Sequence, residues 1–527
     1  MNHEKHHENI DQNHNKKIIK TNASVERNLE AMKTPALIVI ADDFTGALDT
    51  GVQFSKQGIP TYVACNLRNI NSVCLNGYDV LVVDTDSRHM APTDAVKSIM
   101  KVLRMATKLG IRYLYKKTDS TLRGNIGYEL DAVMQYHGGQ SIYFIPAYPE
   151  MNRTTRHGKQ YIDGKILSES IFNADILNPM KTGVIRDLLA EQTNMSIVSI
   201  IKNQLTHDEL FNDMRTIYVF DCETTKDMEE IADKFRKTNV IPLLAGCAGF
   251  AKYVPALIGL KVSKNSQSEP LQQKLNIGAS DEDSIPSEIQ KKVTSTCKSG
   301  GLRKPDKKTA PGKFEYGKSS TEKNPKESIP KHVKQSIEMI SGIHDEFVPV
   351  KKTLIVCGSV NQMSLEQTRL AAENSIPFIT LLPEDILGVK IPKKVMDHAI
   401  RILNQEQFLL LKTVDSSEQI INYQNYGENK QITHVSLKIA VNMGRIIRKI
   451  MTEVDIDHLI VFGGDTLHEV IKALKITGLN PQYEVSHGIP LSKFVINGRS
   501  VNLITKAGGF GDSHTLVNII KILYQKC

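Results

Sequence analysis

The sequence has no tryptophan, few cysteines and no long apolar segment, and each of these absences excludes a class of protein. Its seven cysteines are scattered over 527 residues without a C-x-x-C pair. An odd count without paired spacing indicates reduced thiols and a cytoplasmic location. No apolar run approaches the roughly 20 residues that a membrane span requires, and the polar N-terminus lacks the apolar core of a signal peptide. We therefore expect no membrane partner.

Strong charge of one sign is also missing. The formal net charge is +8, and much of the excess lies in the N-terminal tail and in a lysine-rich central segment. Nucleic-acid binding would need a basic face on a folded element with interleaved aromatic residues, and the sequence shows none. We expect no nucleic-acid partner. If the central segment bound nucleic acid, the affinity would fall steeply with salt concentration. A net positive charge is also suited to the binding of a small anionic substrate.

Length and composition predict two domains with appendages, because 527 residues exceed one ordinary core. Residues 1–34 form a polar, histidine-rich tail that we expect to be disordered. Residues 35–260 and 346–527 are each predicted to form a domain. Between them, residues 261–345 are rich in Lys, Ser, Pro, Gly and Glu, with too few apolar residues to offset the entropy of ordering. We expect a disordered basic linker there, with a helix near 331–341 as an alternative.

Both domains are predicted to be α/β, with a mostly parallel sheet flanked by helices. Short apolar runs alternate with segments of helical spacing, a pattern typical of parallel sheets covered on both faces. The expected strands lie at 36–41, 61–65, 80–85, 113–117, 141–146, 195–201, 217–221, 241–245, 353–359, 377–382, 408–414, 458–466 and 501–512. The expected helices lie at 46–57, 92–109, 125–136, 205–214, 226–237, 249–259, 363–374, 432–453 and 513–524.

Polar clusters follow four of the apolar runs in the first domain. The first is the acid pair Asp42 and Asp43, at which a helix begins, and the others cover 84–88, 116–125 and 146–155. Because the carboxyl ends of parallel strands share one edge of a sheet, the four clusters should converge on one site. A single cluster is more simply explained by ion-paired strand ends and helix caps, but four in register favour a site.

The side chains of these clusters suit an anionic substrate. They include four cations, Arg88, Lys117, Arg123 and Arg153. Guanidinium and ammonium groups bind carboxylates and phosphates. They also include three acids, Asp42, Asp43 and Asp119. These acids are candidates for a base, a hydroxyl anchor or a metal ligand. For Asp86 and Lys116, a solvated position is the alternative.

Three strand ends of the second domain are instead rich in glycine. They are Cys357–Ser359, Gly463–Thr466 and Ala507–Asp512. Glycine lets backbone N–H groups approach a phosphate, and a helix N-terminus favours the anion. No G-x-x-x-x-G-K-[ST] is present, so this is not a Walker loop, and any one of the turns can exist without a ligand. Opposite an acidic and cationic site, the three together predict phosphoryl transfer from a nucleotide with Mg²⁺ on the phosphates.

With these motifs the sequence resembles the four-carbon acid sugar kinase family. The likeness rests on the segments IADDFTGALDTG, DTDSR, KKTDSTLRGNIG, PAYPEMNRTT, CGSVNQMSLEQT, FGGDT and TKAGGFGD. It covers 36–260 and 353–524. Family members have a sugar-acid-binding N-terminal domain and a nucleotide-binding C-terminal domain, and they phosphorylate D-threonate, D-erythronate or an oxo-tetronate with ATP. The long basic linker and GGDT, in place of the commoner Gly-Gly-Glu-Thr, depart from the family pattern.

The resemblance implies a place for both substrates. A small anionic sugar acid would contact Asp42, Asp43, Arg88, Lys117, Thr118, Asp119 and Ser120. ATP would contact Ser359, Gly463, Gly464, Asp465, Thr466 and Gly508. In this arrangement we expect Arg88 to bind the substrate carboxylate, Lys117 to bind its hydroxyls or the transferred phosphoryl group, and Arg123 to neutralise transition-state charge. The base is Asp42 or Asp43. Asp512 competes, because its Gly-x-Gly-Asp turn resembles the base turn of ribokinase-like sugar kinases.

The predicted activity is ATP-dependent phosphorylation of D-threonate or D-erythronate at the 4-hydroxyl. Two alternatives stay open, a 3-oxo-tetronate 4-kinase and a non-catalytic regulator that binds a sugar acid and a nucleotide. The sequence assigns no metal ligands and leaves a homo-oligomer open.

Overall fold

The structure is a computed structural model that describes residues 34–260 and 351–525, apart from 66, 68–69, 71–74, 171–179, 203–213, 238–241 and 415. The predictions for the tail, for the linker with its helix, and for most of the helix at 205–214 lie outside the described residues. In the described part of the chain, no helix is long and apolar enough to cross a membrane.

Strands from both halves of the chain form one sheet. The first half contributes β1 (Leu37–Ala41), β2 (Thr61–Ala64), β3 (Val80–Asp84), β4 (Tyr113–Lys117), β5 (Ile142–Ile145), β9 (Ser196–Ile200), β10 (Thr216–Phe220) and β11 (Leu243–Gly246). The second half contributes β12 (Thr353–Cys357), β13 (Phe378–Thr380), β14 (Phe408–Lys412), β15 (His458–Phe462), β16 (Gly478–Ser486), β17 (Ile489–Ile496) and β18 (Arg499–Lys506). The order of neighbours is β13-β14-β12-β15-β18-β17-β16-β2-β3-β1-β4-β11-β5-β10-β9.

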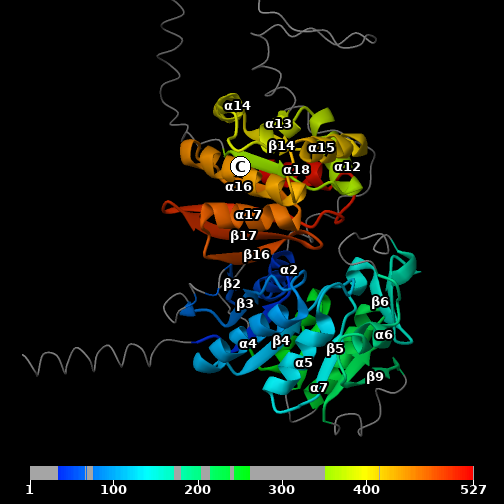
Figure 1. Ribbon diagram of the computed structural model, residues 1–527. Helices are drawn as coiled ribbons and strands as arrows, with labels where there is room; N and C mark the ends of the chain where they lie inside the picture. The colour runs from blue at the N-terminus through cyan, green and yellow to red at the C-terminus, as the bar shows by residue number, and fades with distance from the viewer. Residues whose placement is uncertain are drawn as a thin grey trace, which may run out of the picture.

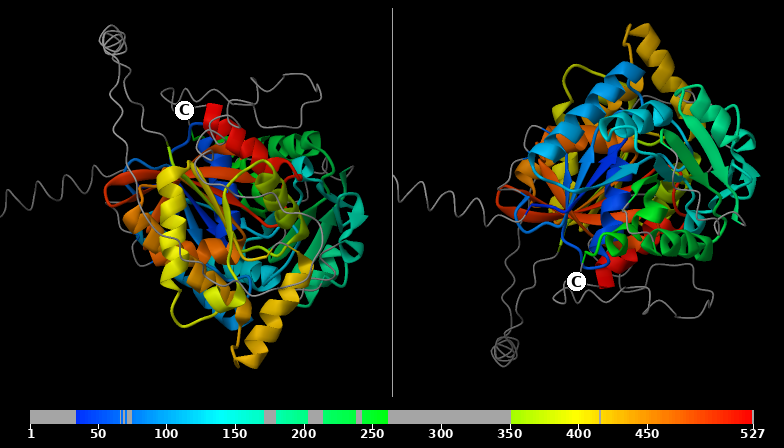
Figure 2. Two further views of the ribbon diagram at one scale, coloured as in Figure 1. Left: turned by 90° about the horizontal axis from the view of Figure 1, so that it is seen from above. Right: turned by 90° about the horizontal axis from the view of Figure 1, so that it is seen from below.

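The strands of the first half are parallel and nearly continuous in apolar residues, because helices cover both faces of the sheet. In β1, with the sequence LIVIA, all five residues are buried. The helices are α2 (Phe44–Ser55), α4 (Pro92–Lys108), α5 (Ile126–Tyr136), α6 (Ile185–Ala190), α7 (Thr225–Lys237), α8 (Ala248–Ala251) and α9 (Val254–Leu257). Figure 2 shows helices on either side of the strands. The predicted α/β class is confirmed.

A small antiparallel sheet, which was not predicted, lies beside the main sheet of the first half. It consists of β6 (Arg153–Arg156), β7 (Lys159–Ile162) and β8 (Lys165–Ile166). Its strands are short and largely polar, so they carry little of the apolar pattern from which strands are recognised. The sheet begins within the predicted polar cluster at 146–155, whose last three residues belong to β6.

The second half combines five parallel strands with an antiparallel extension. β13, β14, β12, β15 and β18 pair in parallel, whereas β17 and β16 continue the sheet in antiparallel fashion. The helices are α12 (Gln362–Glu373), α13 (Pro383–Ile386), α14 (Lys393–Gln405), α15 (Ser417–Asn429), α16 (Val435–Glu453), α17 (Gly464–Leu474) and α18 (Thr515–Gln525). The β16–β17 hairpin and α13 to α15 were not predicted.

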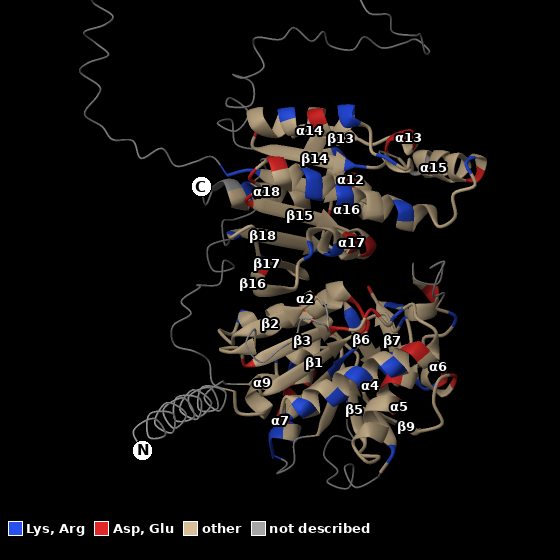
Figure 3. Cartoon of the chain, turned by 60° about the vertical axis from the view of Figure 1, so that its left-hand side comes forward, with Lys and Arg blue, Asp and Glu red and all other residues tan. Residues whose placement is uncertain are grey.

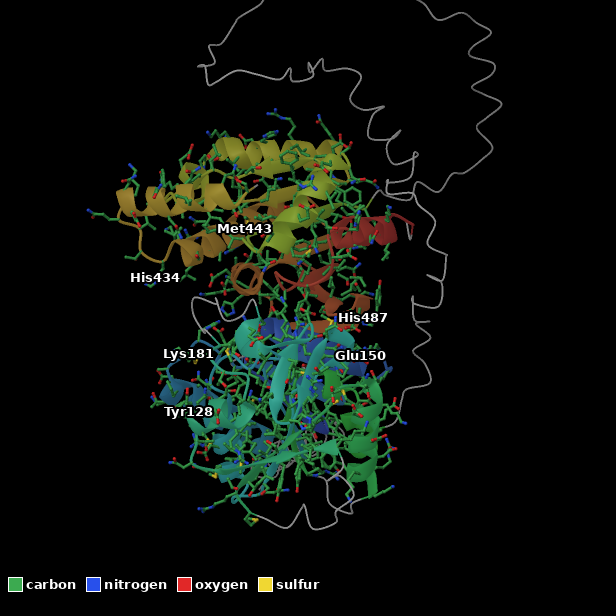
Figure 4. The ribbon with its side chains drawn as sticks, turned by 90° about the vertical axis from the view of Figure 1, so that its right-hand side faces the viewer. Tyr128, Glu150, Lys181, His434, Met443 and His487 are labelled. Atoms are coloured by element: carbon green, nitrogen blue, oxygen red, sulfur yellow. The ribbon has the colours of Figure 1, made fainter. Side chains whose placement is uncertain are left out.

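The two halves meet where β16 pairs antiparallel with β2. Figure 1 shows these strands, with α2 beside them, at the junction between the upper and lower halves. The fit is close, because a Cβ added to Gly51 of α2 would lie 3.1 Å from the Pro481 side chain of β16. Figure 4 shows Glu150 of the first half and His487 of the second at the same junction. The helix that begins at the acid pair therefore also forms the joint between the halves.

Candidate active site

Arg88 joins three acids that come from two strand ends, Asp42 and Asp43 after β1 and Asp119 after β4. It follows β3, and its Nε donates to Oδ2 of Asp42 at 2.8 Å. Its Nη2 lies 2.7 Å from Oδ1 of Asp43 and 3.5 Å from Oδ1 of Asp119. The structure thus brings together the predicted residues that follow β1, β3 and β4, as expected for parallel strands that end at one edge.

Asp119 is held from its other side by Arg123. Nε of Arg123 lies 2.7 Å from Oδ2 and Nη2 lies 3.2 Å from Oδ1, a bidentate pair, and the hydroxyl of Thr121 also donates to this carboxylate. A bidentate pair fixes the plane of both groups. Ser120 is half-buried next to them. Since Arg88 and Arg123 both contact Asp119, two guanidinium groups lie together at this edge, and such groups bind anions.

These cations keep the buried acids ionised. Burial alone would raise the pKa of Asp42, but the charges of Arg88 and two neighbouring lysines outweigh burial and lower this pKa. For Asp119, burial is likewise outweighed by Arg123 and Arg88, which hold its pKa well below the usual range. At neutral pH both side chains are therefore carboxylates.

Lys117, at the end of β4, is a buried cation with spare hydrogen-bonding capacity. The residue is 4% exposed, and its Nζ donates to the carbonyl of Thr118 at 2.8 Å. It forms no salt bridge with a carboxylate of the described residues. A Cβ on Gly46 would lie 2.5 Å both from this Nζ and from Oδ1 of Asp43, so the start of α2 requires glycine. The ammonium has three N–H donors and contacts one acceptor, the carbonyl of Thr118, so it can also bind substrate oxygens.

Lys116 is buried, so the solvated alternative is wrong for this residue. Its Nζ lies 2.8 Å from Oε2 of Glu129, and both side chains are at most 1% exposed. The other carboxylate oxygen of Glu129 accepts a hydrogen bond from Ser87, one residue before Arg88. This network connects the loop after β3 and the end of β4 to α5. The sequence did not single out Glu129, although an acid on the apolar face of a helix is a signal that could have found it.

Asp49, in the middle of α2, is a second acid that the sequence analysis did not single out. Its Oδ1 is buried and has no hydrogen-bond partner among the described atoms. Burial and the nearby carboxylate of Glu484 raise its pKa to about 7. Oδ1 of Asp42 and Oγ1 of Thr118 are also buried without a partner. Buried polar atoms are nearly always paired, so these oxygens in the vicinity of Lys117 indicate where ligand hydroxyl groups would bind.

The glycine turns of the second half also meet at one edge of the sheet. Ser359 lies between two of them, because a Cβ on Gly508 would lie 2.7 Å from its Oγ and one on Gly463 would lie 3.5 Å from its Cβ. Gly358 packs so closely that a Cβ there would overlap with Oγ1 of Thr466. The structure thus brings together the residues predicted to bind the nucleotide.

The two groups of residues face each other. A Cβ on Gly464, at the start of α17, would lie 3.4 Å from Oγ1 of Thr45, in the first turn of α2. Asp86, after β3, is exposed, in agreement with the solvated alternative. Charges still interact across the junction: partial burial of its carboxyl raises the pKa of Asp86, and His468 of α17 opposes this while Asp465 adds to it. Figure 3 shows acidic residues at the end of α17 and charges of both signs beside α2. α17 has no side-chain cap, so its free N–H groups favour an anion here.

Two predicted residues lie apart from the acid cluster. Arg153 belongs to β6, where its Nη1 donates to the carbonyl of Met151 at 2.8 Å and lies 3.5 Å from Oδ1 of Asp163. Asp512 is exposed at the start of α18, and its Oδ1 accepts a hydrogen bond from Oγ1 of Thr515 at 3.0 Å. Asp512 therefore stabilises the turn before α18, and no hydrogen bond to the acid pair is found among the described residues.

A polar joint connects α2 with the nucleotide side. The carboxylate of Glu484, on β16, accepts from Nε2 of Gln53 at 3.3 Å and from Nζ of Lys56 at 2.9 Å. It also accepts from the N–H of Gly488 at 3.1 Å. A Cβ on Gly488 would lie 2.6 Å from the ring of Phe510, in the third glycine turn. Contacts therefore run without a break from the acceptor helix to the nucleotide turn.

A magnesium ion delivered with ATP fits this site. No group of three or more His, Cys, Asp and Glu side chains in the described part of the chain is arranged to hold a metal ion. Mg²⁺ bound with a nucleotide needs less, because one or two carboxylates and the phosphates complete its coordination. The unpartnered Oδ1 of Asp42 and the exposed carboxylate of Asp465 supply oxygen donors of the required kind.

Two family models match the chain, one in each half of the sheet. Residues 37–254 match a sugar-binding N-terminal domain, and residues 354–516 match a nucleotide-binding C-terminal domain. Together these segments cover most of the described residues.

Several characterised proteins are similar in sequence. A Salmonella typhimurium D-threonate kinase is 25% identical over 497 residues, which cover 92% of this chain and 97% of the relative. A Heliobacterium modesticaldum D-erythronate kinase is 24% identical over 520 residues, 93% of this chain and 97% of the relative. An Escherichia coli 3-oxo-tetronate kinase is 31% identical over 163 residues, 29% of this chain and 40% of the relative.

Solved structures share the fold. A Salmonella typhimurium protein superposes with a TM-score of 0.64 at 19% identity and covers 92% of this chain and 98% of its own. A Haemophilus influenzae protein gives a TM-score of 0.59 at 19% identity, with 91% and 98% coverage. The arrangement of two halves in one continuous chain is therefore a known architecture.

Proposed function

Because the chain belongs to the four-carbon acid sugar kinase family, we propose that it transfers the γ-phosphoryl group of ATP to the 4-hydroxyl of D-threonate or D-erythronate. These two acids come first because the D-threonate and D-erythronate kinases align with more than nine-tenths of this chain. The 3-oxo-tetronate kinase of Escherichia coli aligns with 29% of it, so a 3-oxo-tetronate is the second candidate acceptor.

The proposal depends mainly on one observation. The uncapped start of α17 lies against the first turn of α2, with Gly464 next to Thr45. A phosphate at the N-terminus of α17 would therefore lie beside the acid pair and Lys117. Transfer between two bound substrates needs their reacting atoms about 3–3.5 Å apart, and this juxtaposition supports such a geometry.

The residues of the acceptor side have distinct roles in this proposal. The guanidinium of Arg88 binds the substrate carboxylate, and that of Arg123 neutralises the developing phosphoryl charge. Lys117 donates from its buried Nζ to the hydroxyl or to the transferred group. Magnesium, when bound, supplies charge neutralisation on the phosphates. Because water is excluded from much of this region, each of these charges acts more strongly than it would in solvent.

In this proposal, one member of the acid pair is the base that takes the proton from the acceptor hydroxyl. Asp43 is the more accessible member, with 23% of its side chain exposed against 4% for Asp42. Asp49 is a second candidate, because burial and Glu484 bring its pKa to about 7 and a base works best near the operating pH. Asp43→Asn and Asp49→Asn separate the two: the true base loses kcat with little change in KM.

The function is tested by measuring the release of ADP from MgATP in a coupled assay. D-threonate, D-erythronate, their L-enantiomers and 3-oxo-tetronates are compared as acceptors. We expect the highest kcat/KM for one of the two D-acids. Turnover confined to a 3-oxo-tetronate would replace the proposed acceptor, and no turnover by folded protein on any of them would remove the kinase assignment for this acceptor class.

A non-catalytic regulator would behave differently in the same experiments. It would bind ATP and a sugar acid without releasing ADP, and Asp43→Asn would change no rate. The enzyme loses turnover in this variant and keeps ATP affinity, because Asp43 lies on the acceptor side. The acids and cations that the structure brings together around Arg88 favour the enzyme.

A further inference from the structure

Lys506 is the last residue of β18 and is buried beneath the third glycine turn. It is 1% exposed, and no carboxylate of the described residues forms a salt bridge with it. Its Nζ donates instead to the carbonyls of Ala507, Gly508 and Phe510 at 3.0, 2.8 and 2.9 Å. The ring centre of Phe462 lies 4.8 Å away. A buried cation without an acid is costly, so its placement requires a compensating role.

The three hydrogen bonds decide which way the turn faces. A protonated lysine has three N–H donors, and one carbonyl of the turn matches each of them. α12 donates to two of the same carbonyls, because Oγ of Ser364 contacts that of Gly508 and Nε2 of Gln367 contacts that of Phe510. With these carbonyls turned inward, the N–H groups of the three glycines in the turn find no acceptor among the described residues. They are available to an anion.

The charge of Lys506 can be changed within an accessible pH range. Burial lowers its pKa to about 8. The titratable side chain that faces it is Cys357 of β12, and burial raises the pKa of this thiol to about 11. Ser364 and Gln367 of α12 do not titrate. Between pH 8 and pH 10 the lysine therefore loses its proton while the facing thiol stays neutral.

We propose that Lys506 is the positioning residue of the nucleotide site, because its ammonium binds the carbonyls of the turn Ala507–Gly511 and so directs the glycine N–H groups toward the phosphates of ATP. The inference rests on the proposed function of the second half and adds a residue that contacts the turn rather than the substrate. A lysine with a purely structural role would affect stability without a selective effect on ATP.

Titration calorimetry with MgATP, without acceptor, separates these roles. We compare the wild-type protein with Lys506→Met, Lys506→Arg and the control Lys412→Met. Lys412 is 4% exposed at the end of β14, and its Nζ lies 4.4 Å from the ring centre of Phe378. We expect Lys506→Met to weaken ATP binding at least tenfold, Lys506→Arg to recover part of the loss, and Lys412→Met to change affinity less than threefold. Equal affinities for Lys506→Met and wild type would overturn the proposal.

The pH dependence of the wild-type protein provides a test that does not depend on the folding of a variant. Its Kd for ATP should increase above pH 8, whereas Lys506→Arg, which keeps its charge, should show a flat Kd up to pH 9.5. A parallel rise in both proteins contradicts the proposal. In steady-state assays, the loss in Lys506→Met should appear in the KM for ATP, with the KM for the acceptor unchanged.

These outcomes distinguish the two proposals. Wild-type protein that binds ATP with this pH dependence but phosphorylates no tetronate refutes the acceptor assignment and leaves Lys506 in its role. Turnover on a tetronate with normal ATP affinity in Lys506→Met refutes the role of Lys506 alone. Wild-type protein that binds no ATP refutes both.

Discussion

The acceptor side and the nucleotide side of the site are built in different ways. On the acceptor side, charged side chains hold one another: Arg88 contacts three acids, and Lys116 is paired with Glu129. On the nucleotide side, the backbone is exposed at glycine turns that pack too closely for a side chain, as at Gly358. The acceptor side therefore depends on the balance of its charges, and the nucleotide side depends on positions that have no side chain. Different substitutions should impair the two sides.

The largest effect is expected on the acceptor side, from Lys117→Met. The variant removes a buried ammonium that has no acid partner among the described residues, so it leaves no unpaired charge. We expect kcat to fall by about 10³, the range measured when one preorganised donor is removed, with ATP affinity unchanged. Lys97→Met, at a side chain that is 76% exposed, is the control. A loss smaller than tenfold in single-turnover assays would show that the ammonium does not contact the reacting groups.

The next effect concerns the charge balance beneath the site. Glu129→Leu leaves Lys116 buried without its partner, which typically costs about 3–5 kcal/mol. Urea unfolding at pH 7 measures this loss. The double variant with Lys116→Met should recover at least half of it, because both charges are then gone. A double variant no more stable than Glu129→Leu would mean that cavity formation, and not the unpaired charge, causes the loss.

Gly358→Ala is the corresponding test of free volume on the nucleotide side. The added Cβ overlaps with Oγ1 of Thr466, and overpacking of this kind costs about 1–3 kcal/mol. Because the displaced group lies on the nucleotide side, we expect the KM for ATP to rise roughly tenfold while the KM for the acceptor stays within twofold. Equal changes in both values would show that the two sides are not separate.

Asp49→Asn tests the acid that lies between the two sides. Burial raises the pKa of Asp49 to about 7 from 3.8, so the folded protein retains a proton that the unfolded chain releases as the pH rises from 4. Stability therefore falls as the pH rises from 4 to 7 and stays reduced above. Asn does not ionise, so the stability of the variant relative to wild type should increase by about 4 kcal/mol between pH 4 and pH 8, at roughly 1.36 kcal/mol per pKa unit. Thermal unfolding at both pH values decides this.

The strand ends could be predicted from the sequence because each apolar run stops at polar or glycine residues, and parallel strands bring such stops to one edge. This reasoning located Asp42, Arg88, Ser359 and Gly463, which the structure brings to the two facing edges. It did not locate Glu129. The place of this acid on the apolar face of a helix is a local signal that it is buried, but its partner Lys116 lies on a different element and has no local pattern.

The hairpin that joins the halves was missed for a related reason. β16 has the sequence GLNPQYEVS, in which proline and polar residues hide the strand pattern. Its pairing with β2 depends on how two distant segments pack. The same limit applies to Asp49 and Lys506. Asp49 has a buried oxygen without a hydrogen-bond partner, and Lys506 is a buried cation that contacts carbonyls in place of an acid. Neither feature can be recognised from neighbours in sequence.

The smallest effect is expected at the joint, from Lys56→Met. Its ion pair with Glu484 is partly exposed, with 35% of the lysine side chain accessible, and such pairs contribute about 0–1 kcal/mol. Glu484 keeps its hydrogen bonds from Gln53 and from the N–H of Gly488, so the joint should survive. We expect kcat and both KM values to change less than about twofold, because a single exposed ion pair contributes little free energy. A tenfold loss of kcat would instead mean that this contact sets the distance between the acceptor side and the nucleotide side, and that neither side is positioned by its own half alone.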